Sequence, residues 1–139
     1  MQTDPRAREG EDALREAIAA FDESGFARLL GMKVLEAHDG FARVVMDCSG
    51  KMNPHRVAHG GAIFSLAAHA FGIAANCSGA DRVAVSVHIQ YIAPATGSLT
   101  AIAERVADTG NYSTFRVVVF ESTRPVAVFT GVALRICPG

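Results

Sequence analysis

The sequence predicts an α+β fold in which a curved antiparallel sheet of about six strands encloses one long central helix. The helix is indicated by residues 58–76, a run of mainly alanine, leucine, isoleucine and phenylalanine that contains no proline. This run is apolar on almost every side, and such a helix belongs inside a protein. The sheet is indicated by β-rich runs separated by short turns, because short turns join antiparallel neighbours. Strands on both sides of one buried helix are typical of an α+β domain.

The segment before the main domain is predicted to be helical. Residues 1–8 carry charge and a proline, and we expect them to form a loose start. Apolar residues recur at helical spacing over residues 9–22, which predicts an amphipathic helix that covers another part of the fold. Ser24 and Gly31 are suitable first and last residues for a short helical turn.

The chain therefore divides into an N-terminal helical segment, residues 1–31, and a main domain, residues 32–139, with one domain overall. The main domain opens with two predicted strands that are joined by Asp39-Gly40, a dipeptide typical of hairpin turns. These strands cover residues 33–38 and 41–48.

The remaining strands follow the central helix. Residues 82–92 alternate between apolar and polar side chains, which predicts a half-buried strand. One face would carry Val83, Val85, Val87, Ile89 and Tyr91, and the other Arg82, Ser86, His88 and Gln90. Three further β-rich runs cover residues 98–107, 112–121 and 125–136.

Composition excludes several functions. The chain has 139 residues, is 50% hydrophobic and carries a formal net charge of −1, so neither nucleic acid nor anionic lipid is an expected partner. The longest apolar run is interrupted by Ser65, His69 and Gly72, which argues against a membrane span. The cysteines are odd in number and widely spaced, and no apolar secretion segment opens the chain. These features predict a cytoplasmic protein whose thiols are buried: Cys48, Cys77 and Cys137.

One stripe of the central helix differs from the rest because its residues are small or polar. At 3.6 residues per turn the stripe collects Gly61, Ser65, Ala68, His69, Gly72 and Asn76. It is suited to face a ligand or a partner helix. At the beginning of the helix, the turn His59-Gly60-Gly61 brings free backbone N–H groups and the positive end of the helix dipole to one point. This arrangement suits a carbonyl oxygen that gains negative charge during a reaction.

Several motifs occur in a characteristic order along the chain. They are Asn53-x-His55-x-x-x-His59-Gly60-Gly61-x-x-Phe64-Ser65-Leu66-Ala67, then Ala70-Phe71 and Asn76-x-x-Gly79, and later Tyr91-Ile92-x-Pro94, Gly97-x-Leu99-x-Ala101 and Val126-Ala127-x-Phe129-x-Gly131. This combination resembles the hotdog-fold acyl-CoA thioesterases of the phenylacetate-degradation type, over about Phe26 to Ile136. The resemblance implies a hotdog fold and hydrolysis of acyl-CoA thioesters, of the phenylacetyl or benzoyl type. It also implies homodimers or homotetramers whose active sites combine residues of two chains. No metal is implied, and no cofactor beyond the coenzyme A that is part of the substrate.

Carried over position by position, the resemblance gives Gly61 the backbone N–H that holds the thioester oxygen. Asn53 would place the attacking water or the substrate, and His59 would stabilise the loop that leads into the helix. The family has an aspartate, as general base or nucleophile, seven residues after the second glycine, and this chain has Ala68 there. The substrate would contact Gly60, Phe64, Ser65, His69 and Tyr91.

Ala68 is the important departure from the pattern. A carboxylate at this position would lie on the Gly61 face, and helical side chains lean back toward the N-terminus, so it would reach the attacking water. The methyl group of Ala68 cannot act on the attacking water. His69 is rotated by roughly 100° around the helix from residue 68, so it is a poor geometric replacement. Either the protein has diverged, or the chain is a deliberate Asp-to-Ala variant. Retention of the rest of the motif favours the variant.

Other interpretations remain open. A non-catalytic acyl-CoA binding or sensing protein would keep the pocket and lack the base. A hydratase of the same fold fits less well, because residues 61–76 contain no carboxylate. His69 also suits a hydrogen-bonded interior or interface position. We expect most of the scattered arginines to lie on a solvated surface, although one or two would suit CoA phosphates. The arginines are Arg82, Arg105, Arg116 and Arg124.

Overall fold

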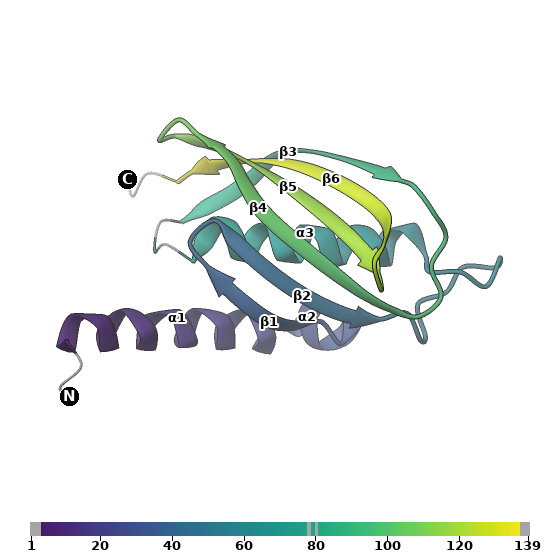
Figure 1. Cartoon of the computed structure of the whole chain (residues 1–139), viewed down its shortest axis with the longest axis horizontal. Helices are drawn as coiled ribbons and strands as arrows, with labels where there is room; N and C mark the ends of the chain where they lie inside the picture. The colour runs from purple at the N-terminus through teal and green to yellow at the C-terminus, as the bar shows by residue number, and fades with distance from the viewer. Residues whose placement is uncertain (1–3, 78, 80, 137–139) are drawn as a thin grey trace.

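The computed structural model describes residues 4–77, 79 and 81–136, and the predicted buried thiol of Cys137 lies outside these residues. Figure 1 shows the order of the elements along the chain. They are α1 (Pro5–Glu23), α2 (Gly25–Leu30), β1 (Lys33–His38), β2 (Phe41–Asp47), α3 (Gly60–Asn76), β3 (Arg82–Tyr91), β4 (Ser98–Asp108), β5 (Tyr112–Glu121) and β6 (Arg124–Arg135). The strands form one antiparallel sheet in the order β1-β2-β4-β5-β6-β3. The predicted α+β architecture is confirmed.

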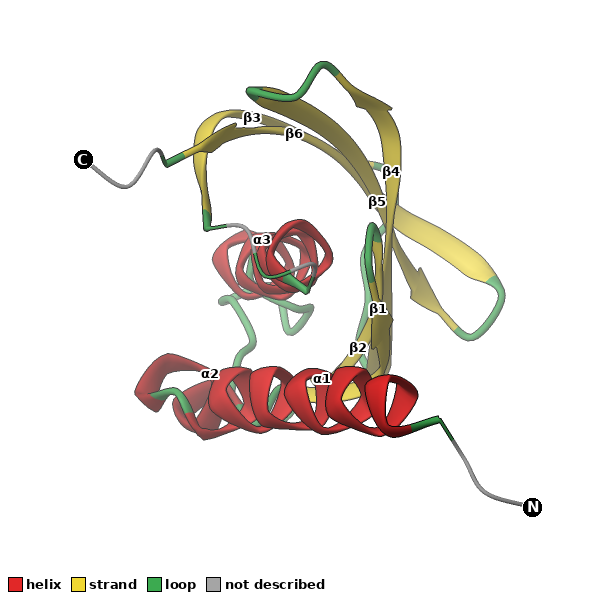
Figure 2. Cartoon of the chain, turned by 90° about the vertical axis from the view of Figure 1, so that its left-hand side faces the viewer, coloured by secondary structure: helices red, strands yellow, loops and turns green. Residues whose placement is uncertain are grey.

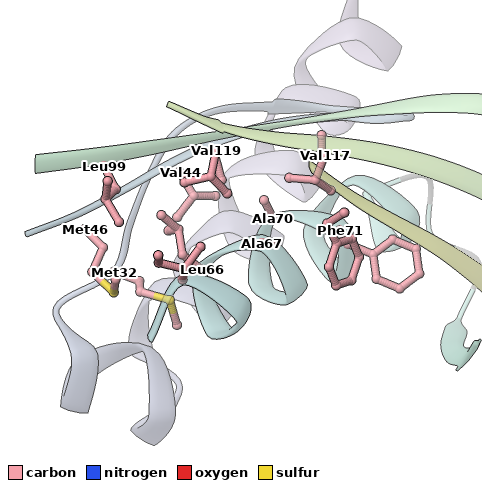
Figure 3. Close-up of a cluster of buried hydrophobic side chains, with 14 of the residues drawn as sticks. Met32, Val44, Met46, Leu66, Ala67, Ala70, Phe71, Leu99, Val117 and Val119 are labelled. Carbon is pink, nitrogen blue, oxygen red and sulfur yellow. The ribbon is translucent and has the colours of Figure 1, made fainter. Parts of the chain in front are cut away.

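The sheet curves around α3, while α1 and α2 lie on the side of α3 away from β3 and β6 (Figure 2). The inner face of the sheet and the buried side chains of α3 form the core. Figure 3 shows Leu66, Ala67, Ala70 and Phe71 of α3 beside side chains of the sheet, which are Val44, Met46, Leu99, Val117 and Val119. Leu66, Ala67 and Ala70 have no exposed surface, which agrees with a helix that is apolar on most sides.

A glycine of β6 lets α3 approach the sheet closely. A Cβ atom on Gly131 would lie 2.9 Å from Cζ of Phe71 and 3.0 Å from Cε1 of Phe129. Real Cβ contacts are longer than this, so any larger residue would displace one of the two buried rings. The absence of a side chain at this position is therefore part of how α3 seats on the sheet.

The N-terminal helix begins earlier than predicted. Its N-cap is Asp4, whose Oδ1 accepts a hydrogen bond from the Arg6 backbone N–H at 3.0 Å, and Pro5 is its first residue. The expected loose start is therefore wrong for residues 5–8, because an Asp-Pro pair suits the beginning of a helix: Asp caps it and Pro fits its first position. No residue of α1 is buried, and its contact with the core comes from Ile18 and Phe21.

Strand β3 is correct as a strand, but the prediction that it is half buried is wrong. It is an edge strand, and Val83, Val85 and Val87 are 44%, 50% and 40% exposed. The register against β6 shifts between Ala84 and Ser86, which is a β-bulge. A bulge adds one residue and reverses which face the following side chains occupy.

The bulge explains why the predicted faces of β3 are mixed. Before it, Arg82 and Ala84 face α3, and after it Val87 does, so these three side chains line one cavity. The uninterrupted alternation in the sequence placed Arg82 and Val87 on opposite faces. The structure instead turns a charged side chain toward the central helix.

Candidate active site

The N-terminus of α3 is organised by its N-cap residue, His59. The Nδ1 atom of His59 accepts a hydrogen bond from the Gly61 backbone N–H at 2.8 Å, and its own backbone N–H donates to the Lys51 carbonyl oxygen at 2.8 Å. The ring must be neutral with its proton on Nε2 for this bond. His59 thus ties the loop to the helix.

This cap determines which backbone N–H is free to donate a hydrogen bond to a ligand oxygen. The Gly61 N–H, which we predicted to hold the thioester oxygen, is already engaged by His59. The backbone N–H of Gly60 has no acceptor among the described residues. Free N–H groups at a helix N-terminus are anion-binding donors. The structure therefore moves the available donor from Gly61 to Gly60.

A first cavity, of about 350 Å³, opens at this end of the helix. It is lined by Asn53, Ala58, Gly60, Ile63, Tyr91, Ile92, Ala93 and Pro94. The Tyr91 hydroxyl donates to the Gly60 carbonyl oxygen at 2.8 Å. The Oδ1 atom of Asn53 accepts from the His55 backbone N–H at 2.9 Å, while its Nδ2 has no acceptor among the described residues. Three of the predicted site residues, Asn53, Gly60 and Tyr91, are thus brought together.

A second cavity, of about 230 Å³, lies between α3 and β3. It is lined by Phe64, Ala68, Phe71, Gly72, Ala75, Asn76, Arg82, Ala84, Val87 and Ala133. Phe64 and Ala68 therefore belong to this cavity, and the structure places them apart from Asn53. Asn53, which was predicted to position the water, and Ala68, where a base was expected, therefore line different cavities of one chain.

Ser65 and His69 lie in neither of these two cavities. The Ser65 hydroxyl donates to the Gly61 carbonyl oxygen at 2.7 Å, one turn back along the helix. The His69 ring packs edge to face against Phe21 of α1, with centroids 6.1 Å apart. These positions do not support their predicted contact with substrate.

His69 is an interior residue with an unpaired nitrogen. Its Nε2 is buried without a hydrogen-bond partner among the described residues. Burial lowers the pKa of His69, and the negative charge of Asp22 opposes this only in part. The neutral ring is therefore favoured in the folded chain.

The expected solvated surface of arginines is wrong for two of them. The side chains of Arg82 and Arg105 are only 7% and 25% exposed. Arg105 donates to Asp39 Oδ1 at 2.6 Å, whereas Arg82 lines the second cavity. The sequence signal for Arg82 was hidden by the bulge in β3, which regular alternation does not reveal.

The described residues also bear on metal binding and on membrane spanning. Among the described residues, no three histidine, cysteine, aspartate or glutamate side chains lie close enough together to hold a metal ion. No helix in the described ranges combines the length and the apolar character needed to cross a membrane.

The family follows from a comparison with known proteins. Residues 48–136, more than half of the chain, match the model of the acyl-CoA thioesterase N-terminal domain. The chain belongs to the acyl-CoA thioesterases. This thioesterase is 35% identical over 130 residues to the acyl-coenzyme A thioesterase PaaI of Escherichia coli K12, covering 89% of this chain and 91% of the relative.

Solved structures agree with this assignment. The structure of the E. coli PaaI protein from the phenylacetic acid degradation operon aligns with a TM-score of 0.85 at 30% identity, covering 92% of this thioesterase and 96% of that chain. A point mutant of the phenylacetic acid degradation protein PaaI of Thermus thermophilus aligns with a TM-score of 0.78 at 34% identity, covering 81% and 100%. The predicted hotdog fold and family are confirmed.

Proposed function

We propose that this chain binds aryl-acyl-CoA thioesters, of the phenylacetyl or benzoyl type, with the carbonyl at the N-terminus of α3. The observation that carries the proposal is the unpaired Gly60 N–H beside a cavity that also contains Asn53. A donor held in place at a helix N-terminus stabilises the oxygen most when it becomes negative in the transition state. Gly61 keeps its bond to His59 and supports the loop.

The acyl group occupies the second cavity, between α3 and β3. Support comes from the two aromatic rings that line it, Phe64 and Phe71, because aromatic side chains pack well against an aryl group. The cavity is smaller than the roughly 300–1,000 Å³ of sites that enclose drug-sized ligands, so it suits an acyl group alone. The names of the relatives, which refer to phenylacetic acid degradation, also favour an aryl group.

Hydrolysis is limited by position 68. Residues 60–76 of α3 contain no carboxylate, and Ala68 presents a methyl group to the cavity. A carboxylate there would accept the proton of the attacking water or attack the carbonyl itself. As it stands, the chain binds the ester and turns it over slowly. This property also suits the second candidate, an acyl-CoA binding or sensing protein.

Two copies of the chain share each site. Support comes from the exposed edge of β3, since an unpaired edge strand with valine side chains is a template for pairing with another chain. It also comes from the separation of Asn53 and Ala68 into different cavities of one chain. In the paired form, Asn53 of one copy would face position 68 of the other. A dimer or a tetramer satisfies this requirement, and we expect the protein in the cytoplasm.

The test compares the chain with its Ala68→Asp and Ala68→Asn variants. Release of coenzyme A from phenylacetyl-CoA and benzoyl-CoA is followed with a thiol reagent, and the size of each sample is measured by light scattering. We expect Ala68→Asp to raise the rate about 10²–10⁴-fold, while Ala68→Asn stays near the starting rate because an amide takes up no proton. Equal, near-zero hydrolysis by all three forms on a panel of acyl-CoAs, or full activity in a monomer, would contradict the proposal.

A further inference from the structure

The peptide group between Gly60 and Gly61 is held at both ends by side chains. Its carbonyl oxygen, on Gly60, accepts a hydrogen bond from the Tyr91 hydroxyl at 2.8 Å. Its N–H, on Gly61, donates to Nδ1 of His59 at 2.8 Å. A peptide group is planar, so two bonds at its opposite ends fix the orientation of the whole unit. The first turn of α3 is therefore anchored by the sheet on one side and by its own cap on the other.

The preceding peptide group, between His59 and Gly60, is bonded only at its carbonyl end. The His59 carbonyl oxygen accepts from the backbone N–H groups of Ala62 and Ile63, at 2.9 Å and 3.2 Å. The N–H of this peptide group belongs to Gly60 and has no acceptor among the described residues. Hydrogen bonds in a chain polarise one another, so the bonds at the carbonyl oxygen strengthen this N–H as a donor. Its direction is set by the bonded groups on either side of it.

Tyr91 also packs closely against the backbone of Gly60. A Cβ atom on Gly60 would lie 3.2 Å from both Cζ and the hydroxyl oxygen of Tyr91, which is tighter than ordinary contact. The phenol therefore uses space that the missing side chain of Gly60 leaves free. Glycine has more conformational freedom than any other residue, so its N–H direction needs an outside restraint. The ring and the hydroxyl of Tyr91 supply that restraint at the first residue of α3.

Tyr91 is the last residue of β3 and reaches the helix from the sheet. Its backbone pairs with Ala127 in the β3–β6 ladder, and the next N–H, of Ile92, donates to the Val126 carbonyl oxygen at 2.8 Å. Its side chain is 50% exposed and lines the first cavity, so it contributes little to the core. Among the described residues, the hydrogen-bond partner of the Tyr91 hydroxyl is Gly60. This contact therefore concerns the site more than the stability of the core.

We propose that Tyr91 is a positioning residue that holds the Gly60 N–H in the orientation needed to bind the thioester oxygen. The inference rests on the proposed function, since it needs this N–H to be the donor. Tyr91 acts through the Gly60–Gly61 peptide group, whose carbonyl oxygen it binds. A donor that is already oriented stabilises developing negative charge better than one that must reorient during the reaction. Loss of the Tyr91 hydroxyl should therefore weaken the contact with the carbonyl specifically.

The test compares two ligands that differ only at the carbonyl. Phenylacetyl-CoA contains the thioester, whereas S-(2-phenylethyl)-CoA is a thioether with a methylene group in place of the carbonyl. Calorimetry gives the dissociation constant of the full chain for each ligand. We expect the unaltered chain to bind the thioester about three- to tenfold more tightly, which is the effect of one hydrogen bond. A general loosening of the fold would weaken both ligands alike and would leave this ratio unchanged.

Two variants test the role of the hydroxyl. Tyr91→Phe keeps the ring and removes the donor, so the preference for the thioester should fall below about twofold. Tyr112→Phe is the matched control, because Tyr112 is 49% exposed, begins β5 and lines neither of the two cavities, and it should keep the preference. Infrared spectra of phenylacetyl-CoA with a carbon-13 carbonyl give a second readout. A hydrogen bond lowers the carbonyl stretching frequency, so this frequency should be higher on Tyr91→Phe than on the unaltered chain.

The possible outcomes separate the two claims. If folded Tyr91→Phe keeps both the preference and the carbonyl frequency of the unaltered chain, the Tyr91–Gly60 bond is purely structural, and the inference is overturned while the proposed function stands. If Tyr112→Phe loses the preference as Tyr91→Phe does, the effect is not specific to Tyr91, and the inference is overturned as well. If the unaltered chain binds both ligands equally and the carbonyl frequency does not fall on binding, or if neither ligand binds, the proposed function itself is overturned.

Discussion

Replacement of Gly131 by alanine should destabilise the fold. The new Cβ would meet Phe71 at 2.9 Å and Phe129 at 3.0 Å, and both rings are buried. Carbon atoms pack best at about 3.5–4.0 Å, so the rings must move by about 0.5–1 Å. Overpacking of a core costs about 1–3 kcal/mol, and the lower chain entropy of alanine offsets about 0.5–1 kcal/mol of this. The expected loss in the free energy of unfolding is therefore about 0.5–2 kcal/mol.

Urea unfolding followed by circular dichroism at fixed protein concentration measures this loss. Gly72→Ala is the matched control, because Gly72 lies within α3 and a Cβ there would meet no heavy atom within 4 Å. Helix propensity predicts that Gly72→Ala raises the free energy of unfolding by about 0.5–1 kcal/mol. If Gly131→Ala is as stable as the unaltered chain, α3 does not seat on β6 as described.

Two further predictions concern polar side chains of α3. Burial lowers the pKa of His69 from the 6.5 of a free histidine, so the unfolded chain takes up this proton first. The free energy of unfolding should therefore fall as the pH drops below about 6.5, and His69→Gln should weaken that fall between pH 7.5 and 5.5, whereas an unchanged pH profile would contradict the buried neutral ring. Asn76→Ala removes three hydrogen bonds, two of which fix the beginning of β3, so unfolding should become easier by about 1–3 kcal/mol. Asn76→Asp keeps the acceptor for the Arg82 backbone and should lose less, and equal losses in the two variants would refute this role.

The fold was predictable because its main signals are periodic and local. The apolar character of α3 and the Asp39-Gly40 turn each identify an element without reference to the rest of the chain. Asp4-Pro5 also signals the start of α1, although the charge and the proline of residues 1–8 predicted a loose start instead. The face of β3 was not predictable, because a bulge between Ala84 and Ser86 leaves no mark in an alternating sequence.

The candidate site was predictable only in part. The turn at residues 59–61 correctly predicted where α3 begins, while the roles of the site residues stay predictions. Which amide is free depends on the His59 ring, whose Nδ1 bonds Gly61 and leaves Gly60 unpaired. The rotamer of the His59 side chain thus decides which of the two backbone N–H groups is free. The spacing of residues in a sequence does not predict a rotamer. The same holds for His69, which faces α1 because Phe21 covers that side of α3.

A crystal structure of the chain with uncleaved phenylacetyl-CoA tests the central claim most directly. The account predicts the thioester oxygen within about 2.7–3.2 Å of the Gly60 backbone nitrogen, the aryl group between α3 and β3, and Asn53 of a second copy beside Ala68. An ester bound with its oxygen far from the beginning of α3, or within a single isolated chain, would contradict it.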